Sequence, residues 1–134
     1  MPNHTLKLAA GVLGACGVAL GAFGAHALKI RLEAAGHTDT WNTAVFYHLI
    51  HTVAILAVTL VLEGTAPAAK SRFLQTAAVA WTIGIILFSG SLYALSLGGP
   101  RWLGPVTPLG GLAFLIGWGC VLANGLKTPA SPEN

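Results

Sequence analysis

Long apolar runs without a charged residue alternate with short charged segments along this chain. The runs cover residues 8–28, 41–62, 73–97 and 102–126, and all seven Lys and Arg and all four Asp and Glu lie between or beyond them. A helix rises about 1.5 Å per residue, so about 20 apolar residues cross the hydrocarbon core of a bilayer. The pattern therefore predicts an all-α integral membrane protein, a bundle of four transmembrane helices.

Four spans use nearly all of the 134 residues, so the chain is expected to form a single domain, residues 1–134. The segment 29–40 is the longest connector. Its mixture of leucine, isoleucine and charged residues predicts a short interfacial helix that ends at Gly36. Because prolines interrupt the start of the fourth run, we expect its helix to occupy residues 105–126, with Thr107 as N-cap and Pro108 in the first position.

The charge balance suits a membrane surface and not a nucleic acid. The net charge is +3, but the basic residues stand singly or in pairs at the ends of the runs, where they fit lipid headgroups. One side of the membrane would hold Lys7, Lys70, Arg72 and Lys127, and the other Lys29, Arg31 and Arg101. By the positive-inside rule, we expect both termini in the cytoplasm and the protein in the inner membrane of the cell.

The first run also resembles a signal peptide, because Ala25-His26-Ala27 looks like a small-x-small cleavage site. The run of residues 8–28 is longer than the usual core of about 7–15 apolar residues. It also carries a stripe of small residues that a discarded segment does not need, namely Gly14, Gly17, Gly21 and Gly24. We therefore expect the segment to be retained. Small residues let helix backbones approach closely, so the stripe predicts a packing seam within the bundle or between two copies.

Polar side chains gather in the half of the bundle near the first and third connectors. The candidates for a polar binding pocket there are His26, His48, His51, Ser89, Ser91, Tyr93, Thr107 and Arg101. The other half is almost without polar groups. Because ionisable groups within spans face the bundle interior, we expect these residues to line a polar pocket in one leaflet half.

The three histidines among them could also bind a metal ion. His48 and His51 share a helix face, and His26 is expected at a comparable depth, so three imidazoles could act as ligands. The spans contain no carboxylate, so the alternative is that each neutral imidazole bonds to a neighbouring helix. Cys16 and Cys120 lie singly within apolar runs and are expected to be inert thiols. The identity of any cofactor does not follow from these motifs.

Four segments resemble a known family, namely residues 20–28, 41–51, 87–93 and 107–118. They are similar to domain-of-unknown-function family 423, small four-span bacterial membrane proteins to which transmembrane protein 256 of animals is related. The resemblance implies the fold and the membrane location but no activity. Its pattern includes His26, His51, Ser89, Ser91, Tyr93, Thr107 and Pro108, whereas the position of His48 often holds another residue.

These observations favour a non-enzymatic membrane protein, either an accessory subunit or a bundle that binds a small molecule. Its partners would be the lipid bilayer and a second copy or another membrane protein. One alternative is transport of protons or a solute past His26, His51 and Tyr93, although the half without polar groups offers no route. Another alternative is a membrane redox protein that holds a metal or haem at His26, His48 and His51.

Overall fold

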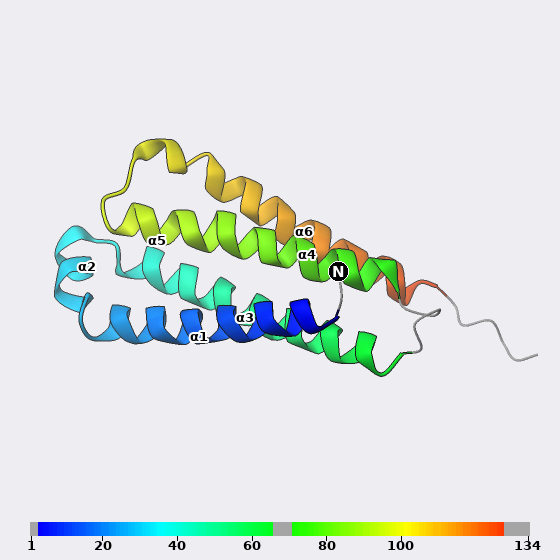
Figure 1. Ribbon diagram of the computed structural model, residues 1–134. Helices are drawn as coiled ribbons and strands as arrows, with labels where there is room; N and C mark the ends of the chain where they lie inside the picture. Colours follow the sequence, from blue (N-terminus) through cyan, green and yellow to red (C-terminus); the bar gives the residue numbers. More distant parts are fainter. Residues whose placement is uncertain (1–2, 66–70, 128–134) are drawn as a thin grey trace, which may run out of the picture.

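The chain folds into four long apolar helices and shorter helical pieces between them. The computed structural model describes residues 3–65 and 71–127, and this part of the chain contains no strand (Figure 1). The helical stretches long and apolar enough to cross a membrane are His4–Ala25, Thr38–Glu63, Arg72–Ser96 and Arg101–Gly125. The predicted all-α, four-span membrane fold is confirmed.

Two of the four spans contain more than one helical element. In chain order the elements are α1 (Asn3–Ala25), α2 (Lys29–Ala35), α3 (Thr38–Glu63), α4 (Arg72–Gly84), the π-helix η2 (Ile85–Ser89), α5 (Gly90–Ser96), the 3₁₀ helix η3 (Arg101–Leu103) and α6 (Val106–Gly125). The third span is continuous across α4, η2 and α5. Within it the N–H of Gly90 bonds to the carbonyl of Ile85, five residues back, which is the spacing of a π-helix.

The connector between the first two spans contains the expected short helix. α1 ends at Ala25, three residues before the predicted boundary, and a turn leads into α2. Leu32 is buried against the bundle, whereas Ile30 is exposed. Gly36 ends α2 with φ of 69°, a left-handed conformation in which its N–H bonds to the carbonyls of Glu33 and Leu32.

The start of the last span differs from the prediction. α6 begins at Val106 after Pro105, without a side-chain cap, so the prediction that Thr107 caps this helix is wrong. The Thr107 hydroxyl bonds sideways instead, 2.7 Å from the Ser91 hydroxyl of α5. A hydroxyl committed to another helix is not available to the free N–H groups of its own first turn.

The helices form two antiparallel pairs that lie side by side (Figure 1). α1 packs on α3, and α6 packs on α4 and η2, while α3 also packs against α4, η2 and α5. α3 and the third span are therefore central, and α1 and α6 are peripheral. The main core lies among them and contains Leu6, Ala10, Ile55, Leu62, Leu74, Ala77, Ala78, Trp81, Ile85 and Phe114.

The glycine stripe of α1 lies against α3. A Cβ atom at Gly24 would lie 2.3 Å from Nε1 of Trp41, and one at Gly17 would lie 2.6 Å from Cδ2 of Leu49. Gly21 and Gly14 face α3 in the same way, over Val45 and Thr52. The indole of Trp41 then donates to the carbonyl of Leu20 at 3.0 Å. The absence of side chains on this stripe lets the large rings and aliphatic groups of α3 reach the α1 backbone.

A second set of glycines joins the third and fourth spans. A Cβ at Gly110 would lie 2.3 Å from the backbone nitrogen of Phe88, so α6 and η2 are in backbone contact there. Gly117 similarly accommodates the indole of Trp81, and Gly84 accommodates the ring of Phe114. This close approach brings the aromatic residues of α6 beside those of α3 and η2.

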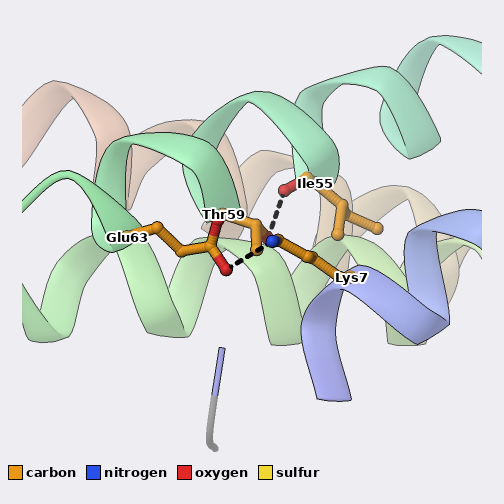
Figure 2. Close-up of polar contacts among 4 residues, drawn as sticks. All are labelled: Lys7, Ile55, Thr59 and Glu63. Atoms are coloured by element: carbon orange, nitrogen blue, oxygen red, sulfur yellow. Dashed lines mark hydrogen bonds and ion pairs between the residues drawn. The ribbon is translucent and has the colours of Figure 1, made fainter. Parts of the chain in front are cut away.

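Ionic and polar contacts join the helices at the end of the bundle opposite α2. Lys7 of α1 forms an ion pair of 2.7 Å with Glu63 of α3 (Figure 2). One turn along α3, the buried Thr59 hydroxyl donates to the carbonyl of Ile55 at 2.7 Å. The hydroxyl of Ser71, which caps α4, bonds to the amide oxygen of Asn124. These contacts join the start of α1 to the end of α3, and the start of α4 to the end of α6.

Candidate functional site

A cavity of about 520 Å³ opens between α3, η2 and α6, and we call it the aromatic groove. Its lining residues are Tyr47, His51, Phe88, Pro108, Gly111, Leu112, Phe114, Leu115 and Trp118. The side chains of Leu115 and Trp118 are 69% and 47% exposed, so the groove opens on the outside of the bundle, where lipid lies. A cavity of this volume has the size of a small-molecule site.

Helical spacing brings its walls together. Tyr47 and His51 are four residues apart on α3, and Phe114 and Trp118 are four apart on α6, so each pair lies on one face. The His51 and Phe114 rings stack at 3.7 Å with an angle of 9° between their planes. Phe88 enters from η2, and its ring centroid lies 4.7 Å from that of Tyr47. The inner wall is thus a continuous set of stacked and tilted rings.

Two hydrogen bonds define the protonation of His51. Its Nδ1 lies 2.8 Å from the carbonyl oxygen of Tyr47, and its Nε2 lies 3.2 Å from Nε1 of Trp118. A carbonyl only accepts and an indole only donates, so Nδ1 must carry the proton and Nε2 must be the acceptor. His51 is therefore a neutral imidazole whose two nitrogens are both engaged.

His48 belongs to a different contact, although it is only three residues from His51. Its Nδ1 lies 3.3 Å from the hydroxyl of Tyr93 on α5. On its other side the ring approaches α1, where a Cβ at Gly17 would lie 3.4 Å from Cδ2 of His48. The Tyr93 ring packs in turn on Trp41, with centroids 4.8 Å apart. His48 thus links the first and third spans across α3, away from the aromatic groove.

The two serines among the candidates, Ser89 and Ser91, also differ in their contacts. Ser91 joins α5 to α6 through Thr107 and also donates to the carbonyl of Phe88 at 2.9 Å. Ser89 is fully buried, and its hydroxyl has no hydrogen-bond partner among the described residues. Neither serine lines the aromatic groove.

The remaining two candidates, His26 and Arg101, are exposed at the connector end of the bundle. It is Arg31 that bonds across this end, donating from Nη2 to the carbonyl of Leu97 at 2.8 Å. Within residues 3–65 and 71–127, no group of three His, Cys, Asp or Glu residues is placed to hold a metal ion. The structure does not bring the three histidines together.

Of the eight candidates only His51 lines the cavity, whereas separate interhelical bonds hold His48 to Tyr93 and Ser91 to Thr107. The other walls come from residues that were not among the eight candidates, above all Phe88, Phe114 and Trp118. The available signal was the recurrence of Gly111, Phe114 and Trp118 at intervals of three and four residues. Such a stripe marks one helix face but does not say what the face meets.

The helices and the groove define a small four-span integral membrane protein with a lateral, aromatic-walled cavity. The chain belongs to the family described as "Protein of unknown function (DUF423)", which matches residues 20–111. A UPF0382 membrane protein of Haemophilus influenzae is 43% identical over 88% of this chain and 90% of its own length. The UPF0382 membrane protein YwdK of Bacillus subtilis is 38% identical over 82% and 86%, respectively.

The UPF0382 inner membrane protein YgdD of Escherichia coli is 35% identical over 95% of this chain and 93% of its own length. No solved structure matches the chain. The relatives establish that this is a small bacterial-type membrane protein of an uncharacterised family, as the resemblance in the sequence implied.

Proposed function

We propose that this protein is a non-enzymatic membrane protein that binds an apolar small molecule taken sideways from the bilayer. The aromatic groove supports this proposal most directly. Its opening lies between exposed side chains of α6, and its floor is formed by the stacked rings of His51 and Phe114. Ligand sites are concave, mostly apolar and furnished with few polar groups, and the groove has each of these properties.

The groove can be filled selectively to test this proposal. Gly111 lines it, and a Cβ there would have only an ordinary contact, 3.9 Å from Cδ2 of Phe88, so a larger side chain at this position would enter the groove. Gly119 lies on the same helix outside the groove, with nothing within 4 Å of its Cβ position. The matched variants are therefore Gly111→Leu and Gly119→Leu.

The measurement is photolabelling in lipid nanodiscs with a hexylbenzene that carries a diazirine. We expect saturable labelling of α3 and α6 in the unmodified protein and in Gly119→Leu. Because its groove is filled, Gly111→Leu should bind the photoprobe at least about tenfold more weakly. Burying one apolar group of side-chain size is worth more than about 1.4 kcal/mol, and the filled groove loses at least that much. Equal labelling of the two variants, or labelling that never saturates, would contradict the proposal.

We also propose that the protein lies in the inner membrane with both termini in the cytoplasm. The name of the E. coli relative supports the location. The positive-inside rule supports the orientation, because the side expected to hold the termini carries Lys7, Lys70, Arg72 and Lys127, against Lys29, Arg31 and Arg101 on the other side.

The alternative is an accessory role, in which the protein packs on a second copy or on another membrane protein. One observation favours it. The outer face of α1 is exposed at Val12 and Val18, and nothing lies within 4 Å of a Cβ at Gly11. Small residues on an open face permit close helix contact. The mass of the nanodisc particle distinguishes the two roles, because a lone monomer without a copurifying protein argues against the accessory one.

A further inference from the structure

We infer that the ligand of the aromatic groove carries a hydroxyl group, which binds between His51 and Trp118. This inference rests on the proposed function and adds the chemical class of the ligand, namely a phenol or a ring alcohol with an apolar body. It comes from the lining residues whose side chains carry polar groups, namely Tyr47, His51 and Trp118.

His51 supplies an acceptor of fixed direction. Its side chain is only 4% exposed, and the bond from Nδ1–H to the Tyr47 carbonyl holds the ring and its tautomer in place. The ring is held from the side by stacking on Phe114. Because Nδ1 is occupied within α3 itself, Nε2 is the atom through which His51 can bind another group, and it points to Trp118 on α6.

Trp118, the present partner of His51 Nε2, is the most exposed of the three polar lining residues. Trp118 is about half exposed, and its bond to Nε2 measures 3.2 Å, at the long end of the usual range. A hydroxyl enters here when the half-exposed indole moves outward, because the two nitrogens now bond directly. It can then donate to Nε2 and accept from the indole N–H at the same time, so both protein groups remain bonded. An ether or carbonyl oxygen can only accept, and would leave Nε2 without a donor in a site where unpaired polar atoms are costly.

The stacked walls determine the shape of the body that carries the hydroxyl. Rings of Tyr47, Phe88 and Phe114 follow one another with centroid distances of 4.7 to 5.9 Å. Such rings attract another aromatic ring in offset or edge-on geometry. A ring with an apolar tail toward the lipid and a hydroxyl toward His51 fits this arrangement.

The test compares 4-hexylphenol with its methyl ether, 4-hexylanisole, as competitors of the diazirine photoprobe in nanodiscs. The two competitors differ only in the group on the oxygen, which is a hydrogen in the phenol and a methyl group in the ether. The control variant is His51→Phe, which keeps a ring to stack on Phe114. For each protein we take the ratio of the two concentrations that displace the photoprobe. Comparing this ratio between the two proteins removes the difference in how the competitors partition into the bilayer. We expect 4-hexylphenol to be favoured by about 3- to 10-fold in the unmodified protein relative to His51→Phe, the effect of one hydrogen bond.

A second readout is NMR of the histidine side chains. In protein labelled with ¹⁵N-histidine, 4-hexylphenol should shift the His51 Nε2 resonance, because its hydroxyl becomes the donor to this nitrogen. 4-Hexylanisole has no O–H to donate, so the Trp118 indole should remain the donor to Nε2. Trp118→Phe removes the resident donor but keeps the acceptor, so it should retain the preference for the phenol.

The outcomes separate the two proposals. Saturable photolabelling with no difference between phenol and ether, in either readout, overturns the hydroxyl inference and leaves the binding function standing. If the photoprobe does not label the groove saturably and neither competitor acts, the binding function itself fails.

Discussion

At the scale of single residues, polar groups that are close in the sequence bond in different directions. His48 and His51 illustrate this, because a separation of three residues places them on neighbouring parts of one face, yet one bonds toward α5 and the other toward α6. The two serines of the third span differ as well. Ser91 bonds to Thr107, whereas Ser89 is buried in η2 without a partner among the described residues.

This difference predicts opposite effects of two small substitutions. Ser91→Ala should lower the free energy of unfolding by about 0.6 kcal/mol, the average for hydrogen bonds between membrane helices. Ser89→Ala should leave it unchanged or raise it slightly, since an unpaired buried hydroxyl costs free energy. Reversible unfolding in mixed detergent micelles measures both, and a larger loss for Ser89→Ala than for Ser91→Ala would contradict the assigned bonds.

At the scale of the helices, glycines determine how closely the spans approach. Those on α1 admit Trp41 and Leu49 of α3, and those on α6 admit Trp81 and the backbone of Phe88. A side chain can turn aside to accommodate a new methyl group, but a backbone atom in a packed helix cannot. Gly110, which faces the Phe88 backbone, is therefore the least replaceable of these positions.

We predict that Gly110→Ala destabilises the bundle by about 1–3 kcal/mol, the usual cost of overpacking. The matched control is Gly119→Ala, on the same helix, where a Cβ meets nothing within 4 Å. This change should leave stability unchanged or raise it by up to about 1 kcal/mol, because alanine favours a helix interior over glycine. Unfolding in mixed micelles again serves as the measurement. Equal stability of the two variants would show that α6 does not touch η2 at this point. Gly110→Ala should also reduce photolabelling, because the groove requires this contact.

At the scale of the whole molecule, the first two spans and the last two form separate antiparallel pairs joined mainly through α3. α1 and α6 are peripheral, and their outer faces meet lipid. The ion pair between Lys7 and Glu63 (Figure 2) joins the start of α1 to the end of α3, and α2 lies at the opposite end of the bundle (Figure 1). The two ends should therefore face different compartments.

Single-cysteine labelling tests this topology. In a background of Cys16→Ser and Cys120→Ser, an impermeant maleimide added to intact cells should label Ala34→Cys in α2 but not Gly64→Cys at the end of α3, both of which are exposed positions. Lysis should make both reactive. The reverse pattern would show that the termini face outward, and labelling of both sites in intact cells would contradict a path of four spans.

The number and extent of the spans followed from the sequence, because a bilayer accepts only long uncharged helices and their lengths are visible in the chain. The glycine stripe of α1 and the stop at Gly36 were likewise evident from local spacing. The aromatic groove was decided by tertiary structure alone. It depends on the π-helix η2, on the backbone contact at Gly110 and on which faces of α3 and α6 meet. In lipid both core and surface residues are apolar, so hydrophobicity identifies the spans but does not distinguish the wall of a cavity from a face that meets lipid.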